Sequence, residues 1–232
     1  IGAIHSFSFH NYVTLFTTPE LIDMIIGSIA LAIGSAVLAT ILGTTGAIGA
    51  FYSKKNVNGT MSVLNQIPVV NADVVTGFSL CILLVVVFGV SKNTYIPLVI
   101  GHTVLSAPFV YLAVVPKLKQ MDPSLYEAAL DLGATPGYTL IHIIIPQIAS
   151  GIISGFVMAV TLSLDDYFVA TYTKPATFDT ISTYVVNATK GSQTNIRTAL
   201  WALSTIIFLI VVIVEVVMNF APIKNEAQKE KH

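Results

Sequence analysis

The sequence has 232 residues, of which 54% are hydrophobic and only 10% are charged. An ordinary soluble domain carries about 25% charged residues, so this composition indicates a membrane protein. The net charge of −1 offers no basic surface for nucleic acid, and nucleic-acid binding is not expected. A single cysteine, Cys81, excludes a disulfide framework and a cysteine-based metal cluster.

Five apolar stretches approach or exceed the roughly 20 residues that a membrane-spanning helix needs. They lie near 24–51, 67–90, 96–115, 148–170 and 198–220. The second is short if it begins at Val74, so we expect it to begin near Ile67, with Pro68 at its entrance. The sequence therefore predicts an all-α membrane protein, a bundle of about five transmembrane helices forming one domain over 1–220, with a tail over 221–232.

Two of these stretches carry small residues at every fourth position, the spacing that lets membrane helices approach closely. The first has Ser35, Ala39, Gly43 and Ala47, and the fourth has Gly151, Gly155 and Ala159. This pattern predicts helix packing inside a bundle.

The Lys and Arg residues of the connecting segments predict the orientation in the membrane. If the first span runs inward, seven basic residues face the inside and four the outside. The inner set is Lys54, Lys55, Lys117, Lys119, Lys224, Lys229 and Lys231, and the outer set is Lys92, Lys174, Lys190 and Arg197. We therefore expect the N-terminus of this chain outside, the C-terminus in the cytoplasm and the segment around 122–146 in the cytoplasm.

The segment 122–146 is polar between two apolar stretches, and its pattern predicts two short helices that meet at a glycine. Asp122 suits a helix N-cap, and Gly133 suits the left-handed residue that ends a helix. Thr135 and Pro136 repeat a capping residue followed by proline, so a second helix is expected to run to Ile145 and end at Pro146. We call this segment the elbow.

The elbow carries Glu127-Ala128-Ala129, then Gly133 after three residues, then Ile143-Ile144-Ile145-Pro146 after nine more. This resembles the EAA loop of ABC-transporter permease subunits, E-A-A-x3-G-x9-I-x-L-P, with Ile145 in place of leucine. The resemblance implies that Glu127, Ala128, Ala129, Gly133 and Pro146 couple the chain to a cytoplasmic ATPase.

The flanking stretches GHTVLSAPFVYLAVVPKLKQMDPSLYEAALDLGA and GFVMAVTLSLDDYFVATYT resemble the spermidine/putrescine permeases of that class. The resemblance runs from about Phe7 to Phe220 and implies an inner-membrane importer subunit of bacteria. Its expected partners are a cytoplasmic ABC ATPase dimer, a second homologous permease subunit of the PotB type and an extracellular or periplasmic polyamine-binding protein. Since the family has six spans, its first helix is expected before Ile1.

Two adjacent carboxylates, Asp165 and Asp166, lie in the outer part of the fourth stretch, where a charged side chain in a membrane is costly and marks function. On one continuous helix, Asp166 lies about 20° from Gly155 and Ala159, and Asp165 points about 100° away. Two carboxylates this close repel each other unless a cation or a donor accompanies them. A polyamine, a flexible string of ammonium groups, supplies such a cation, whereas a structural pair bonded to neighbouring helices is the alternative.

Three further residues join the expected substrate path. The rings of Tyr167 and Phe168 offer cation–π contacts of roughly 0.5–2 kcal/mol. Asp73 at the start of the second span has a counterpart in the resembled permeases, and it either lines the path or caps a helix.

No phosphate-binding loop of the form G-x-x-x-x-G-K-[ST] is present, so ATP hydrolysis is expected on a separate subunit. No spacing typical of a catalytic triad or a metal site occurs, and we expect no catalytic residue, metal or cofactor. Three alternatives remain: a permease for another small solute, an ion-coupled transporter or channel, and an intramembrane enzyme using both aspartates. An ion-coupled transporter or channel has no need of the elbow. Membrane aspartyl proteases usually place their two aspartates on different helices, whereas adjacent residues of one helix diverge.

Overall fold

The computed structural model describes residues 17–122 and 124–190, together with positions 205, 208, 209, 212 and 216. Every regular element in these residues is helical. The chain divides into two compact units, Ile29–Phe178 and, separately, Ile1–Ser28 with Asp179–His232. The expected fifth span over 198–220 lies outside the described residues apart from the five isolated positions, each of which is helical.

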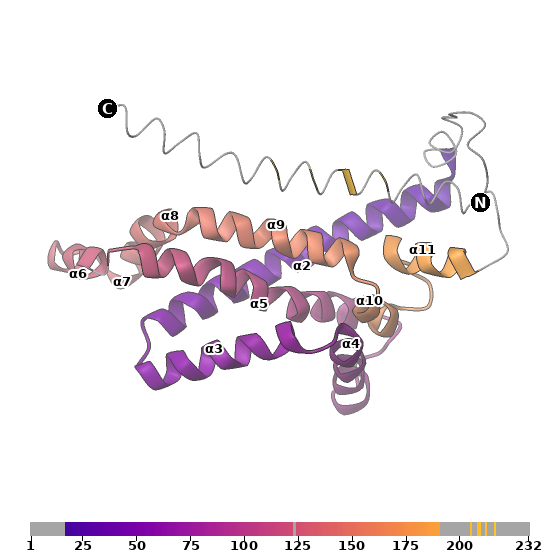
Figure 1. Cartoon of the computed structure of the whole chain (residues 1–232), viewed down its shortest axis with the longest axis horizontal. Coiled ribbons are helices and arrows are strands. Elements are labelled where there is room, and N and C mark those ends of the chain that lie inside the picture. The colour runs from indigo at the N-terminus through magenta and orange to yellow at the C-terminus, as the bar shows by residue number, and fades with distance from the viewer. Residues whose placement is uncertain are drawn as a thin grey trace. The chain divides into compact units, whose positions relative to one another are not determined.

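The larger unit is a bundle of helices (Figure 1). It contains the part of α2 (Pro19–Phe51) from Ile29 onward, α3 (Lys55–Val70), α5 (Ile96–Gln120) and α9 (Ala149–Asp165). α5 packs against both α9 and α3. The elbow helices α6 and α7 lie at the end of α5 and α9 where α5 finishes and α9 begins.

Two helices of the described residues are long and apolar enough to cross a membrane, over Leu21–Phe51 and Ile96–Gln120. Two bent helix pairs meet the same criterion: Lys55–Val70 with Asp73–Val87, bent by 104°, and Pro136–Gln147 with Ala149–Asp165, bent by 71°. The described part of the chain thus holds two to four spans, depending on whether each bent pair crosses the membrane once.

The segment expected to form a span from Ile67 to 90 is not one continuous helix. Ile67 belongs to α3, which ends at Val70, and the next helix, α4 (Asp73–Cys81), starts after an extended Asn71 and continues as a π-helical segment, Ile82–Val87. Pro68 lies inside the last turn of α3 rather than at the entrance of a span. The residue between them, Ala72, is also extended, so two successive extended residues separate the helices.

α3 exposes large apolar side chains. Val63, Leu64 and Ile67 are more than half exposed. Its polar residues are divided, because Asn58 and Asn65 are half-buried whereas Asn56, Thr60 and Gln66 are exposed. The exposed apolar groups suit hydrocarbon surroundings.

The small residues predicted to pack between helices do so. A side-chain carbon at Gly43 would lie 2.7 Å from Val110 on α5, and one at Gly155 would lie 3.0 Å from the Val110 backbone. Ala39 and Ala159 are fully buried in the same core. The close approach of α2 and α9 to α5 therefore requires these small side chains.

The expected continuous fourth span over 148–170 is also wrong, because α9 ends at Asp165. Asp166 is extended (φ −66°, ψ 124°), and a short helix, α10 (Phe168–Thr173), follows it. α10 packs against α4 and α5 at two glycines: a side-chain carbon would lie 2.9 Å from the Val169 backbone at Gly77 and 2.8 Å from the Val169 side chain at Gly101.

The smaller unit contains α11 (Ile181–Lys190), in the segment between the expected fourth and fifth spans. Its start is closed by a reciprocal pair in which Thr180 N–H donates to Thr183 Oγ1 and Thr183 N–H donates to Thr180 Oγ1. Ile181 N–H donates to Ser28 Oγ, and Leu21 packs against Ile181. A capped helix thus follows α10 in the chain.

Candidate substrate path and coupling elbow

The first half of the elbow is α6 (Ser124–Asp131), and its end has the hydrogen bonds of a Schellman motif. Gly133 has a φ of +85° and donates its N–H to Leu130 O at 2.9 Å. Ala134 N–H donates to Ala129 O at 3.0 Å. This is the left-handed helix end expected at Gly133, which residues with a side-chain carbon adopt only at a cost.

The second half of the elbow begins as expected and ends later. Thr135 Oγ1 accepts from Tyr138 N at 3.4 Å at the start of α7 (Pro136–Thr139). A π-helical segment, Leu140–Ile144, and α8 (Ile145–Gln147) continue it. The expected end at Pro146 is therefore wrong: the helix passes through Pro146 and bends at Ile148, because the wider turn before the proline accommodates its missing N–H.

The elbow exposes an apolar side chain beside its turn. Leu132 is 90% exposed and immediately precedes Gly133. Glu127 and Ala128 are exposed as well. Ala129 is only 6% exposed, so it packs within the elbow and offers no surface to a partner. The exposed set that a partner can contact therefore includes Leu132, which the EAA pattern leaves unspecified.

The elbow is firmly joined to the bundle. Ile144 and Ile148 are fully buried in the core that also holds Leu118 of α5. The ring of Tyr126 on α6 lies 5.0 Å from that of Tyr52, which follows α2. The elbow is thus packed against α5 and the end of α2.

A cavity of about 430 Å³ lies at the break between α9 and α10. Its lining comprises Pro68, Val69, Asp73, Leu105, Phe109, Leu162, Asp165, Asp166, Tyr167 and Phe168. All five residues assigned to a substrate path from the sequence are in this set, from segments more than 90 positions apart. The sequence did not reveal the apolar part of the lining that α5 contributes. Its residues, Leu105 and Phe109, are indistinguishable in the sequence from other apolar residues of a span.

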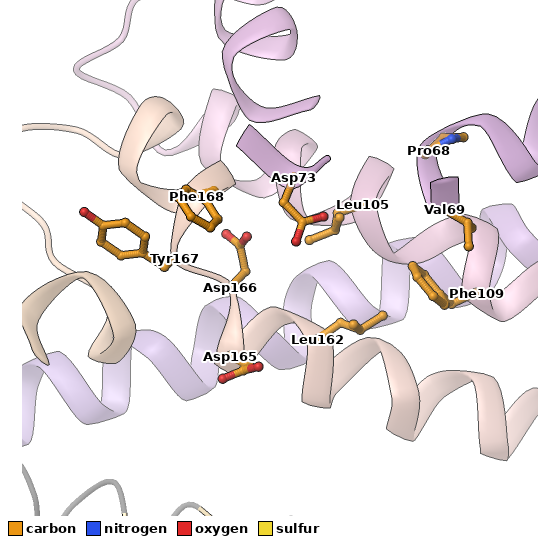
Figure 2. Close-up of a pocket in the computed structure, with 10 residues that line it drawn as sticks. All are labelled: Pro68, Val69, Asp73, Leu105, Phe109, Leu162, Asp165, Asp166, Tyr167 and Phe168. Carbon is orange, nitrogen blue, oxygen red and sulfur yellow. The ribbon is translucent and has the colours of Figure 1, made fainter. Parts of the chain in front are cut away.

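Figure 2 shows how the three carboxylates lie. Those of Asp73 and Asp166 point toward each other, and that of Asp165 points away from both. The angle expected from one continuous helix does not apply, because α9 ends between Asp165 and Asp166. The two residues diverge for a different reason, the change of backbone direction at the break.

Asp166 is held by the start of α10. Its Oδ1 accepts from Val169 N at 3.2 Å and its Oδ2 from Ala170 N at 2.7 Å, and the residue is 8% exposed. Backbone N–H groups at a helix start favour a negative charge. Asp166 therefore has a structural role in capping α10 as well as its place in the cavity wall.

Asp73 and Asp165 are exposed in the cavity. The alternative that Asp73 caps a helix is wrong, because the capping position of α4 is Ala72 and no side chain caps it. Asp73 is instead the first helical residue, where a carboxylate is favoured by the helix dipole. These two carboxylates are the accessible ones.

A buried polar network lies behind Asp166. His102 on α5 is fully buried; its Nδ1 lies 2.8 Å from Ser163 Oγ, and its Nε2 lies 3.7 Å from Asp166 Oδ2. Ser163 Oγ in turn lies 3.2 Å from Ser35 Oγ on α2. The sequence analysis did not connect these residues, whose contacts join positions 61 and 128 apart.

The family model for "binding-protein-dependent transport system inner membrane component" matches residues 43–221, more than half of the chain. The chain belongs to this family of transport permeases. The elbow, including Glu127 and Pro146, lies within the matched range. The resemblance drawn from the EAA pattern is thereby confirmed at the level of the family.

Three curated relatives of this permease carry polyamine names. The chain is 30% identical to the spermidine/putrescine transport system permease protein PotC of Haemophilus influenzae, covering 94% of this chain and 83% of the relative. It is 28% identical to PotC of Escherichia coli, covering 87% and 76%. It is 34% identical to the putrescine transport system permease protein PotI of Escherichia coli over 62% of this chain and about half of that relative, 53%.

Two solved structures share the fold at low sequence identity. A bacterial ABC transporter involved in import of the acidic polysaccharide alginate superposes with a TM-score of 0.70 at 18% identity, covering 93% of this chain and 84% of that one. An amino acid ABC transporter superposes with a TM-score of 0.63 at 17% identity, covering 93% and 97%. The predicted all-α membrane fold is confirmed as that of ABC-transporter permeases.

Proposed function

We propose that this permease forms half of the translocation path for polyamines in an ATP-driven importer of the bacterial inner membrane. The observation that carries the proposal is the cavity, where Asp73, Asp165 and Asp166 surround one space together with Tyr167 and Phe168. A chain of ammonium groups needs several separated carboxylates, and aromatic rings add cation–π attraction. The names of the curated relatives support the same substrate class.

Within this proposal, Asp73 and Asp165 contact the cation directly and Asp166 supplies a fixed charge in the wall. The first two are exposed in the cavity, whereas both oxygens of Asp166 already accept backbone N–H groups. A charged pair in low-dielectric surroundings interacts at longer range than in water. Asp166 therefore attracts a cation without an open coordination position of its own.

The elbow is proposed as the docking site for one subunit of a separate cytoplasmic ATPase dimer. Its exposed Leu132, Glu127 and Ala128 form the contact surface, and its buried Ile144 carries motion into the bundle. A second permease of the PotB type completes the path, and an extracellular binding protein delivers the substrate. The N-terminus of this chain then lies outside and its C-terminus in the cytoplasm.

Uptake of labelled spermidine or putrescine by cells carrying single Asp→Asn variants tests the substrate assignment. Loss of one charge-assisted hydrogen bond, about 1.5–3 kcal/mol, weakens substrate engagement by roughly ten- to a hundredfold. Asp73→Asn and Asp165→Asn should show this loss with normal capture by the binding protein. Wild-type uptake in the double variant would leave the carboxylates as structural groups and refute the cation path.

Cysteine labelling with an impermeant thiol reagent tests the orientation. A cysteine at Asn93, between the Ile82–Val87 segment and α5, should react from outside, and one at Asn56, at the start of α3, should not. Both variants need the Cys81→Ser background so that only the introduced thiol reports. The reverse pattern would place the elbow outside the cell and exclude its contact with a cytoplasmic ATPase.

A further inference from the structure

The buried imidazole of His102 has one nitrogen that the bundle leaves unbonded. The side chain is fully buried on α5, and Nδ1 lies 2.8 Å from Ser163 Oγ. Nε2 has no hydrogen-bond partner among the described residues and faces Asp166 Oδ2 at 3.7 Å, too long for a hydrogen bond. A buried polar atom without a partner is costly, and this one is directed at a carboxylate of the cavity.

The protons of the neighbouring hydroxyls determine which nitrogen of His102 is protonated. Each serine has one O–H proton. Ser35 donates its proton to Leu31 O at 2.8 Å. With Ser35 as donor to Leu31 O, the 3.2 Å contact between the serines is a hydrogen bond only when Ser163 donates and Ser35 accepts. In that arrangement Ser163 has no proton left for the imidazole, and the bond at 2.8 Å has His102 Nδ1–H as its donor.

With the proton on Nδ1, neutral His102 presents a bare lone pair at Nε2. This lone pair faces Asp166 Oδ2, which is also an acceptor. Two acceptors do not bond, and this accounts for the 3.7 Å separation within an otherwise closely packed network. A single proton between the two atoms converts them into a hydrogen-bonded pair.

We infer that His102 Nε2 and Asp166 Oδ2 form a binding site for one proton, and that His102 is a positioning residue that sets the charge of the cavity wall. Without the proton, the pair has a charge of −1. With a proton taken from water through the cavity, the pair is neutral overall and the two atoms are drawn together.

The surrounding groups make this proton sensitive to the contents of the cavity. The titratable groups near the pair are Asp73 on α4, Asp165 at the end of α9 and Tyr167 directly after Asp166. α2 contributes the neutral Ser35, and α10 contributes the N–H groups that Asp166 accepts. Two further carboxylates favour proton uptake when the cavity is empty, and a bound cation opposes it. This consequence rests on the proposed cationic substrate, whereas the proton site itself does not.

The direct test is nitrogen NMR of His102 in the transporter assembled in lipid bilayers. The chain is labelled with ¹⁵N-histidine, and the other histidines, His5, His10, His142 and His232, are replaced. At alkaline pH we expect a protonated Nδ1 and a bare Nε2, and on acidification Nε2 gains its proton. A bare Nδ1 with a protonated Nε2 at alkaline pH would overturn the inference.

Ser163→Ala provides a matched variant for the same measurement. It removes the acceptor that holds the proton on Nδ1, so the tautomer with the proton on Nε2 becomes favourable because Asp166 accepts from it. We expect the two nitrogen signals to exchange their protonation states at alkaline pH. An unchanged tautomer in this variant would show that Ser163 does not direct the proton and would refute the hydrogen-bond assignment.

Transport provides a second readout. If the proton competes with the cation, the apparent KM for spermidine rises by up to about tenfold per pH unit below the pH at which the pair of His102 and Asp166 takes up its proton. His102→Asn retains a donor toward Ser163 and removes Nε2, so this slope should flatten, whereas Gly34→Ala on α2, with nothing within 4 Å of its added carbon, should retain it. A wild-type slope in His102→Asn would overturn the coupling. Absence of any spermidine uptake with the expected NMR signals would instead refute the proposed substrate and leave the proton site standing.

Discussion

The elbow and the cavity are built in opposite ways. The elbow is one continuous stretch whose turn is formed by its own residues, with Gly133 at a φ of +85° and Thr135 capping the next helix. The cavity takes its lining from α3, α4, α5, α9, the break after α9 and the first residue of α10. A contiguous element retains its shape through local hydrogen bonds, whereas an assembled cavity depends on how distant helices pack. The elbow therefore keeps its shape independently of the other helices, whereas the cavity does not.

The largest effect should come from a charge on the exposed tip of the elbow. Leu132→Asp places a carboxylate where an apolar contact is proposed, and Glu127→Lys reverses a charge on the same surface. Both should reduce ATP-dependent uptake at least about a hundredfold, since an unpaired charge buried in an interface costs several kcal/mol.

Leu132→Met is the matched control for this contact, because it retains an apolar side chain of similar volume. Co-purification with the ATPase and ATP-dependent uptake are the two measurements. Normal uptake in Leu132→Asp with the ATPase still bound would show that the tip makes no such contact.

The same contrast explains what the sequence predicts and what it does not. The glycine that ends α6 and the threonine that caps α7 act on neighbours three or four residues away, so a local pattern reveals them. The break at Asp166 is not visible locally, because no glycine or proline marks it and the apolar run continues into α10. Packing of Val169 against Gly77 and Gly101 favours the separate helix. The helix propensity of the local sequence cannot reveal a break that depends on packing with distant residues.

The buried network shows a further limit of prediction. A histidine, two serines and an aspartate at 102, 35, 163 and 166 have no common spacing in the chain. The helical face of Ser35 was expected to pack, and it does, but its hydroxyl also fixes the hydrogen bonds of Ser163. Only the assembled bundle brings these groups within bonding distance.

Gly77→Ala should distort the cavity while leaving the elbow intact. The new side-chain carbon would lie 2.9 Å from the Val169 backbone, which cannot move without shifting α10 and the cap at Asp166. Such overpacking costs about 1–3 kcal/mol. Gly34→Ala on α2 is the control, since nothing lies within 4 Å of its added carbon. The thermal unfolding temperature and the rate of spermidine uptake should both fall for Gly77→Ala only. Equal values for the two variants would contradict the close packing of α10 against Gly77.

A smaller effect is expected at the turn of the elbow. Gly133→Ala meets no neighbour within 4 Å, but its φ of +85° is strained for any residue with a side-chain carbon, at a cost of about 1 kcal/mol. Gly137→Ala also meets no neighbour and lies in α7 at an ordinary helical φ, so it should be neutral or slightly stabilising. Hydrogen exchange of the α6 amides measures the difference, and equal protection in both variants would mean that the left-handed turn is not maintained in solution.

The smallest effect concerns acid and the first turn of α6. Asp122 Oδ1 accepts from Ser124 N at 2.9 Å and from Ser124 Oγ at 2.8 Å, and these bonds lower the pKa of the exposed Asp122 carboxyl below its ordinary value. Because the folded pKa is depressed, the contribution of Asp122 is present above the unfolded value of about 3.9 and is lost as pH falls through the folded value. Exchange of the Ser124 amide should therefore accelerate, relative to the other α6 amides, only on acidification into that range. Asp122→Asn keeps an acceptor oxygen without the charge, so it should remove the pH dependence while retaining part of the protection. A pH dependence that persists in Asp122→Asn would assign the titration to another group of the elbow.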